Sequence, residues 1–273
     1  MASNRPRPNL RLRSSASGLE PLNLTTATFR FYAELNDFLA PARRGQAFAV
    51  KCAPTSTTKH MIEALGVPHT EVELILINGE SAGFDQRLRD GDRLSIFPAF
   101  RSFKPTTLQR VRELPQRIQF VADAHLGALA RRLRMAGFNT LYRNDYEDRE
   151  IAEIAERENR IVLTRDRDLL KHRVIIHGCY IHAMKPPQQF YEVMRRLNLT
   201  LQQQPFTLCI VCNLPLRQVT KEAVVANLPL SVRSNPNYEK FTTCDCCGRI
   251  YWKGSHWQRM AALFNDSTLT RKC

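Results

Sequence analysis

The chain has 273 residues, and its 40 lysines and arginines outnumber its 26 acidic residues, which gives a formal net charge of +14. This length predicts two or three small domains, and the charge favours a polyanionic partner, with nucleic acid first, over a basic protein that has no such partner. No apolar run approaches the ~18 residues of a transmembrane helix, so we expect no membrane span.

Residues 1–25 begin with MASNRPRPNLRLRSSASG, which contains four arginines, no acid and no apolar core. This composition does not match a secretory signal. It does resemble an organelle transit peptide, but two prolines interrupt any amphipathic helix, so we expect a disordered basic tail. In the absence of a secretory signal we expect a cytoplasmic, reducing location, where the eight cysteines bind metal rather than form disulfides.

Residues 26–100 are predicted to form a compact domain. TATFRFYAEL and QAFAVK predict two strands, the first with both phenylalanines on one face. TSTTKHMIEALG predicts a helix that Ser56 or Thr57 caps and Gly66 ends, and VELILING and DGDRLSIFPAF predict two more strands. This order resembles the ubiquitin-like β-grasp domains, which include sulfur carriers. The Gly-Gly tail of the sulfur carriers is absent, so the resemblance implies a binding or scaffolding role with a protein partner.

Residues 101–117 are basic, carry two prolines and are predicted to be an interdomain linker. Residues 118–204 then alternate between two patterns. IQFVAD, NTLYRND, RIVLT and VIIHGCYIH predict strands, and HLGALARRLRMAG, YEDREIAEIAEREN and PPQQFYEVMRRLNL predict helices. Strands that alternate with helices predict a parallel sheet covered on both faces, which is an α/β domain.

Residues 205–264 hold five of the eight cysteines, and residues 265–273 form a short tail. Two Cys-x-x-Cys pairs have the spacing that suits tetrahedral zinc bound by four thiolates, and they are formed by Cys209, Cys212, Cys244 and Cys247. We therefore predict a zinc ribbon, a module too small to fold around its own apolar core without the ion. Cys246 and His256 are alternative ligands, and HWQRMAALF predicts a final helix.

Aspartates follow the predicted strands of the α/β domain at the point where each strand ends. Asp123 follows FVA directly, and Asp166 follows IVLTR. Asp145 and Asp148 follow a third strand, and Asp168 comes two residues after Asp166. Because ligands bind beyond the carboxyl ends of strands in such sheets, these carboxylates are candidates to hold Mg²⁺ or Mn²⁺. Helix capping is the alternative, since Asp145 and Asp148 have the spacing of a capping box and either later aspartate suits the LLKH turn.

Three quoted segments together resemble a known family. They are FVADAHLGALARRLRMAGFNT, NDYEDREIAEIAERENRIVLTRDRDLL and the cysteine block CIVCNLPL…CDCCGRIYWKGSHW. In this order they resemble the Mut-seven C-terminal RNase domain of the PIN-like ribonuclease superfamily, whose bacterial members often carry a β-grasp domain in front. The resemblance implies a metal-dependent nuclease in which Asp123, Asp148 and Asp166 hold the ion, with Asp168 and Asp145 as further carboxylates.

Basic residues near these aspartates are candidate RNA contacts. Arg131, Arg132 and Arg134 lie off the apolar stripe of the first predicted helix of this domain, and Arg165 adjoins a strand-end aspartate. Each is expected to bind phosphate, with a solvated protein surface as the alternative. His125 directly follows the first strand-end aspartate and is expected to begin the helix rather than to contact substrate.

Two functions from different classes follow from these patterns. The first is a metal-dependent endoribonuclease, in which Mg²⁺ or Mn²⁺ is catalytic and zinc is structural. The second is a non-catalytic RNA- or ribosome-binding adaptor, in which the PIN-like domain is a degenerate scaffold. RNA is the expected partner in both cases, so cleavage is the property that distinguishes them.

Overall fold

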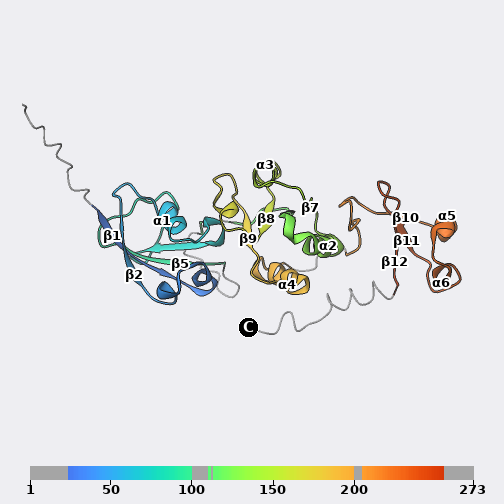
Figure 1. Cartoon of the computed structure of the whole chain (residues 1–273), viewed down its shortest axis with the longest axis horizontal. Coiled ribbons are helices and arrows are strands. Elements are labelled where there is room, and N and C mark those ends of the chain that lie inside the picture. Colours follow the sequence, from blue (N-terminus) through green and yellow to red (C-terminus); the bar gives the residue numbers. More distant parts are fainter. Residues whose placement is uncertain (1–23, 100–109, 112, 200–204, 255–273) are drawn as a thin grey trace, which may run out of the picture.

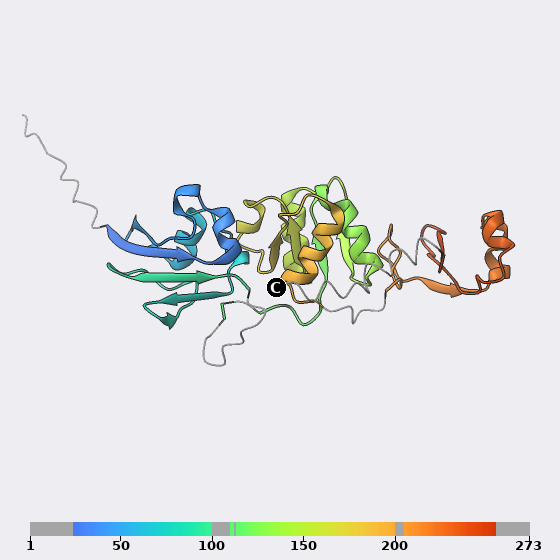
Figure 2. The same ribbon diagram turned by 90° about the horizontal axis from the view of Figure 1, so that it is seen from below.

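The computed structural model describes residues 24–99, 110–111, 113–199 and 205–254. It contains three domains in chain order, with the N-terminal and C-terminal domains at opposite ends of the central one (Figure 1). The view from below shows the same order (Figure 2). Within these ranges, no helix has both the length and the apolar character that a membrane crossing requires.

The N-terminal domain is a ubiquitin-like β-grasp fold. Its five strands pair in the order β2-β1-β5-β3-β4, with β1 parallel to β5 and the other pairs antiparallel. The elements are β1 (Thr25–Phe31), η1 (Ala33–Phe38), η2 (Pro41–Arg43), β2 (Phe48–Cys52), α1 (Thr58–Ala64), η3 (His69–Glu71), β3 (Leu74–Ile77), β4 (Glu80–Ser81) and β5 (Arg93–Phe97), where η marks a 3₁₀ helix.

Local sequence explains the main elements of this domain. Alternation in β1 buries Phe29 and Phe31 against the helix side of the sheet. The Thr57 side chain caps α1 by accepting a hydrogen bond from the His60 N–H at 3.3 Å. Gly66 follows the helix at a φ of +100°, a conformation that other residues rarely adopt. The predicted element order of strand, strand, helix, strand, strand is confirmed, with β4 as an additional short strand, and so are the Thr57 cap and the Gly66 stop.

The central domain is built on the predicted parallel sheet, whose four strands lie in the order β7-β6-β8-β9. Successive residues of β6 face opposite sides, so that Phe120 packs with α2 and α4 while Val121 packs with α3. Figure 1 shows α3 and α4 on opposite sides of the sheet. The elements are β6 (Phe120–Ala122), η4 (Ala124–Leu126), α2 (Gly127–Met135), β7 (Thr140–Tyr142), α3 (Asp148–Glu158), β8 (Ile161–Thr164), η5 (Leu169–Lys171), β9 (Gly178–Tyr180) and α4 (Pro186–Arg196).

The C-terminal domain is a small antiparallel sheet with a helical insert. Its elements are β10 (Arg217–Val219), α5 (Lys221–Val224), η6 (Val225–Asn227), α6 (Leu230–Arg233), β11 (Phe241–Thr243) and β12 (Ile250–Trp252). The small core joins the insert to the sheet and consists of Val224, Leu228, Val232 and Phe241. The predicted final helix, together with His256, lies outside the described residues.

The C-terminal domain caps one edge of the central sheet. On edge strand β7, the Thr140 N–H donates to Asn213 Oδ1 at 2.9 Å, and the Thr140 carbonyl accepts from Arg134 Nε at 2.9 Å. Arg134 also donates to the carbonyls of Ile210 and Val211 at 3.0 and 2.7 Å. One arginine of α2 therefore ties the first cysteine loop to the strand edge.

The β-grasp domain caps the opposite edge in the same way. On β9, the Tyr180 N–H donates to Glu71 Oε1 at 2.7 Å, and the Tyr180 carbonyl accepts from Arg196 Nη1 at 2.5 Å. Arg196 also forms an ion pair with Glu71, whose side chain is fully buried. Gly178 permits this close approach, since a Cβ there would lie 3.1 Å from Thr70 Cβ. Unpaired backbone N–H and C=O groups on an edge strand can pair with a strand of another chain. Here the two neighbouring domains cover both edges of the sheet.

Candidate functional site

The strand order places two of the predicted aspartates at the switch point of the central sheet. The chain leaves β6 towards β7 on one side, whereas it leaves the neighbouring strand β8 towards β9 on the other side. Ligands of open α/β sheets bind at such a point, beyond the carboxyl ends of the strands. Asp123 directly follows β6, and Asp166 lies two residues beyond β8. Both therefore stand at the crevice where a ligand is expected.

A cavity of about 570 Å³ opens at this crevice. Asp123, Asp148 and Asp166 line it together, which brings the three principal predicted carboxylates to one place. The other lining residues come from both the central domain and the β-grasp domain, and they are Gly66, His125, Arg165, Arg167, Asp168, Lys171 and Tyr180. The cavity thus combines acidic side chains, which attract cations, with basic side chains, which attract phosphate.

Thr164, the last residue of β8, connects the two strand-end aspartates. Its hydroxyl donates to Asp123 Oδ2 at 2.7 Å and accepts from the Asp166 N–H at 2.9 Å. Asp166 Oδ1 in turn accepts from the Asp168 N–H at 2.7 Å. Asp166 therefore stabilises the turn after β8 and also lines the cavity. The capping and ligand interpretations of this residue do not exclude each other.

The start of α3 differs from the predicted cap. Glu147 is the N-cap residue, and it forms a reciprocal capping box with Glu150, whose Oε2 accepts from the Glu147 N–H at 3.1 Å. The predicted capping box of Asp145 and Asp148 is therefore wrong. Asp148 becomes the first helical residue, and burial, followed by the charges of the two strand-end aspartates, raises the pKa of its carboxyl. Such mutual repulsion is what a divalent cation relieves.

The carboxylates form an open cluster rather than a closed one. In the part of the chain that the structure describes, the four cysteines are the one group of three or more metal-binding side chains whose ligand atoms all lie within 4.8 Å. The three aspartates do not form such a close group. They are hard oxygen donors, the type of ligand that Mg²⁺ and Mn²⁺ take in proteins.

The two remaining predicted acids already have cationic partners. Asp145 does not line the cavity, and Arg143 donates two hydrogen bonds to it at 2.9 Å, which lowers the pKa of the Asp145 carboxyl. Asp168 does line the cavity, but Lys171 lies 2.9 Å from its Oδ1 and lowers the pKa of that carboxyl. Asp168 occupies the N-cap position of η5 without a side-chain cap bond.

The four predicted phosphate ligands are placed differently from one another. Arg134 is buried and donates to three carbonyls, so the prediction that it lies on a solvent-facing or phosphate-binding surface is wrong. Its guanidinium instead bonds to the Thr140 carbonyl at the edge of β7. Arg131 and Arg132 belong to the same helix but do not line the cavity. Arg165 does line it, and its Nη1 donates to the Ala183 carbonyl at 3.0 Å.

Sequence reasoning missed several residues that line the cavity. Arg167 lies between the last two aspartates of the quoted TRDRD segment, and Lys171 lies three residues after Asp168. Because both lie within three residues of a candidate aspartate, the sequence could have predicted that they line the same cavity. Tyr180 gave no such signal, because its place depends on which strand forms the sheet edge. His125 lies in the 3₁₀ turn η4, as expected of a helix start, and it also lines the cavity.

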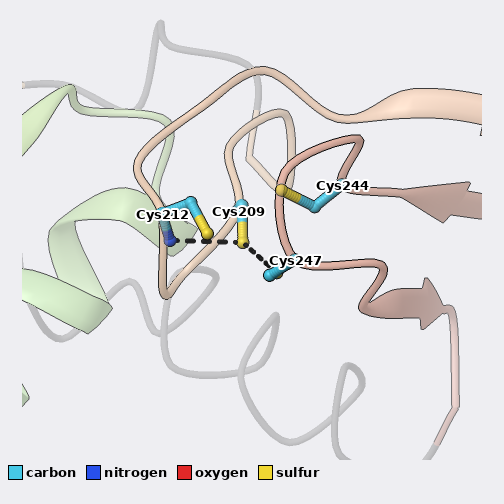
Figure 3. A group of neighbouring side chains, drawn as sticks. All are labelled: Cys209, Cys212, Cys244 and Cys247. Atoms are coloured by element: carbon cyan, nitrogen blue, oxygen red, sulfur yellow. Dashed lines mark hydrogen bonds between the residues drawn. The ribbon is translucent and has the colours of Figure 1, made fainter.

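The second site is formed by the four predicted cysteines. Figure 3 shows that two loops each supply two of them, and the sulfur atoms of Cys209 and Cys247 lie 3.7 Å apart. The loops share one backbone design, in which the residue after the second cysteine has a positive φ and donates its N–H to the carbonyl of the first cysteine. These residues are Asn213, with a φ of 60° and a bond of 2.9 Å, and Gly248, with 67° and 2.8 Å.

The pKa values of the two cysteines in the first loop move in opposite directions, and a hydrogen bond with Cys247, followed by burial, raises that of Cys212. Burial raises the pKa of Cys209, but hydrogen bonds from the Tyr251 hydroxyl and from the N–H groups of Cys212 and Val211 outweigh it and lower the pKa to about 6. A thiolate at neutral pH is the form that binds metal. Cys246 is exposed and does not belong to the cluster. The four cysteines can therefore bind a metal such as zinc.

The fold and its two sites define a three-domain chain in which a β-grasp domain and a cysteine-rich metal-binding module flank a parallel α/β domain with an acidic cavity. Comparison with protein families matches residues 118–264 to the Mut7-C RNAse domain and residues 24–104 to the Mut7-C ubiquitin domain. The chain belongs to the Mut7-C RNAse domain family. Its family resemblance, inferred from three sequence segments, is confirmed.

Two further comparisons are less informative. Among solved structures, the chain is similar to SAMP1 from Haloferax volcanii, with 20% sequence identity, 28% of this chain and 96% of that chain covered, and a TM-score of 0.23. A comparison with curated proteins finds no match. The assignment to a family therefore stands on the two domain matches.

Proposed function

We propose that this protein is a metal-dependent ribonuclease, and that Asp123, Asp148 and Asp166 hold Mg²⁺ or Mn²⁺. The supporting observation is that these side chains, from the ends of two strands and the start of a helix, line a single cavity at the switch point of the sheet. Helix capping does not explain why these three side chains lie at the same cavity. Membership of an RNAse domain family supports the choice of reaction.

The ion would supply positive charge to the scissile phosphate and lower the pKa of an attacking water. The protein's own residues prepare the site for it. The Thr164 hydroxyl fixes the Asp123 carboxylate and the backbone of Asp166, so both acids are oriented before substrate arrives. Burial raises the pKa of the Asp148 carboxyl, and the charges of Asp166 and Asp123 raise it further, a repulsion that the ion would relieve. Arg165, at the same cavity, offers donors to a phosphate oxygen.

The remaining assignments concern zinc, partners and location. We propose that the four-cysteine cluster holds structural zinc, because four sulfur donors within 4.8 Å suit a closed tetrahedral site. The seven described cysteines are all free, which suits a reducing compartment such as the cytoplasm. RNA is the proposed substrate, and a protein partner would bind the β-grasp surface that does not contact the central domain.

Cleavage of an RNA oligonucleotide by the purified full-length chain in the presence of Mn²⁺ tests the ribonuclease assignment. Asp166→Asn should lower the rate by at least the roughly 10- to 100-fold that is usual for weakening a metal site. Asp145→Asn is the matched control, because Asp145 is exposed, paired with Arg143 and absent from the cavity lining. It should cleave like the unaltered protein.

The same assay separates the ribonuclease from the adaptor. Salt-sensitive RNA binding without any Mn²⁺-dependent cleavage would favour a non-catalytic adaptor. Equal activity of Asp166→Asn and the unaltered chain would remove Asp166 from the reaction. Only a loss that is specific to the cavity aspartates supports the enzyme.

A further inference from the structure

The acidic cavity is not confined to the central domain, because the β-grasp domain forms part of its wall. Gly66, which follows α1, lines the cavity together with the three aspartates. The backbone of Gly66 is fixed by its φ of +100° and by a bond from its N–H to the Glu63 carbonyl at 3.0 Å. The cavity is therefore a cleft between two domains.

Several contacts hold the two walls of this cleft together. Arg167 Nη1 donates across the junction to the Phe38 carbonyl at 3.3 Å. His69 Nε2 lies 2.9 Å from the Ile175 carbonyl, and all three residues of η3 are buried. The Phe38 ring meets Tyr180 edge-on at 5.2 Å. With so many buried contacts the junction is a fixed surface, and the position of Arg167 depends on the β-grasp backbone.

The chemistry of the cleft matches one class of ligand. Arg165, Arg167 and Lys171 bring three cationic side chains to it, and Lys171 also pairs with Asp168 at 2.9 Å. A groove lined with cationic side chains is how proteins follow the backbone of single-stranded nucleic acid. A volume of about 570 Å³ is that of a small-molecule pocket, so it admits one or two unpaired nucleotides rather than a duplex.

We propose that single-stranded RNA binds in this interdomain cleft, with its phosphates on Arg165, Arg167 and Lys171 and its chain against residues 63–67 of the β-grasp domain. The β-grasp domain is then a part of the substrate site and not a separate attachment. This inference rests on the proposed ribonuclease function, because the cleft would deliver the strand to the carboxylates. Arg167 is the phosphate contact that the β-grasp domain positions.

Binding of a fluorescent single-stranded RNA to the full-length chain tests the role of Arg167. The measurements use an Asp166→Asn background, which prevents cleavage during the titration. Arg167→Ala should raise the dissociation constant roughly tenfold, the scale of one charge-assisted hydrogen bond, and reduce the slope of log K against log salt concentration by about 0.7. Arg173→Ala is the matched control, since Arg173 is exposed on the same segment and does not line the cleft. It should bind as the background protein does.

Photo-crosslinking with an RNA that carries 4-thiouridine tests the β-grasp wall without changing the protein. We expect crosslinked peptides from residues 63–67 and from the segment after β8. Crosslinks confined to the C-terminal domain, or an unchanged affinity and salt slope for Arg167→Ala, would overturn the proposal. Cleavage is measured separately, so an inactive protein that still binds through Arg167 contradicts the ribonuclease assignment and leaves the binding site standing.

Discussion

Thr164 illustrates how a single buried hydroxyl organises the acidic site. It donates to Asp123 and accepts from the backbone of Asp166, so it acts as an outer partner of two proposed metal ligands. The side chain is fully buried at the end of a core strand. Residues in this outer position orient carboxylates, and their loss weakens metal binding although they never touch the ion.

Thr164→Val should therefore lower the affinity for Mn²⁺ by roughly 10- to 100-fold. It should also lower the free energy of unfolding by about 0.5–1.5 kcal/mol, because the Asp166 N–H loses its partner in a partly buried hydrogen bond. Thr164→Ser keeps the hydroxyl and should keep the affinity. Calorimetric Mn²⁺ titration and thermal unfolding measure the two effects. Equal Mn²⁺ affinity in the Val and Ser variants would show that the hydroxyl does not orient the site.

The sequence predicts the individual acids unequally. Asp123 and Asp166 were predictable, because each follows an apolar strand and parallel strands end at one edge. Asp148 was ambiguous, since Asp and Glu both suit a cap and the local sequence NDYED offers several candidates. In the structure Glu147 is the cap, with Glu150 three residues on as its box partner, whereas Asp145 bonds to Arg143.

At the scale of elements, the two edge strands of the central sheet are completed by side chains from other domains. Glu71 of η3 and Asn213 of the first cysteine loop accept the outward N–H groups of β9 and β7, across 109 and 73 residues of sequence. Periodicity predicts that these strands exist, because it reports which side chains are apolar. It does not predict their edge partners, since those depend on how domains dock. Arg134 was misassigned for this reason.

The ion pair between Glu71 and Arg196 is the strongest test of this edge capping. Glu71→Gln removes the nearest carboxylate of the buried Arg196, which keeps only the more distant Glu34 and Glu192 at 3.9 Å. It should lower the free energy of unfolding by about 3 kcal/mol, the low end for a buried pair that loses one partner. Glu34→Gln is the control, because Glu34 lies 3.9 Å from the same arginine and is more exposed. A pair of that kind is worth at most about 1 kcal/mol.

Chemical denaturation of the two variants measures this difference. A loss for Glu71→Gln no larger than that for Glu34→Gln would mean that the junction does not depend on the buried charge. The double change Glu71→Met with Arg196→Met removes both charges and should be less destabilised than Glu71→Gln alone. That outcome would separate two contributions to the free energy of unfolding, the cost of a buried charge that has lost its partner and the stabilisation by the ion pair itself.

At the scale of the whole molecule, the net charge of the chain is positive, whereas the carboxylates of the proposed metal site are negative. The chain carries a net charge of +14, while its cavity gathers four aspartates. A field of this sign would attract a polyanion such as the proposed RNA substrate and raise its rate of encounter. The local acids would repel its phosphates unless a cation is bound. The basic surface and the cationic side chains of the cleft would hold the strand, whereas the reaction would need metal, so RNA binding should outlast cleavage when metal is removed.

The cysteine cluster also acts beyond its own domain, because it adjoins the edge of the central sheet. Cys212 directly precedes Asn213, which caps β7, and Arg134 binds the two carbonyls between the first pair of cysteines. Loss of the ion should unfold the small ribbon, since such modules depend on metal for their stability. It should also release the Thr140 amide, while the opposite edge at Tyr180 keeps its Glu71 partner.

Cys247→Ser and Cys246→Ser provide a matched pair for testing this coupling. Both cysteines are exposed, but Cys247 belongs to the four-sulfur cluster and its neighbour Cys246 does not. Cys247→Ser should lose bound zinc and exchange the Thr140 amide hydrogen much faster, with the Tyr180 amide unaffected. Cys246→Ser should retain zinc and match the unaltered protein. Zinc analysis and residue-resolved hydrogen exchange make the measurement. Faster exchange at both edges would indicate global unfolding, and unchanged exchange at Thr140 would show that the sheet edge does not depend on the metal.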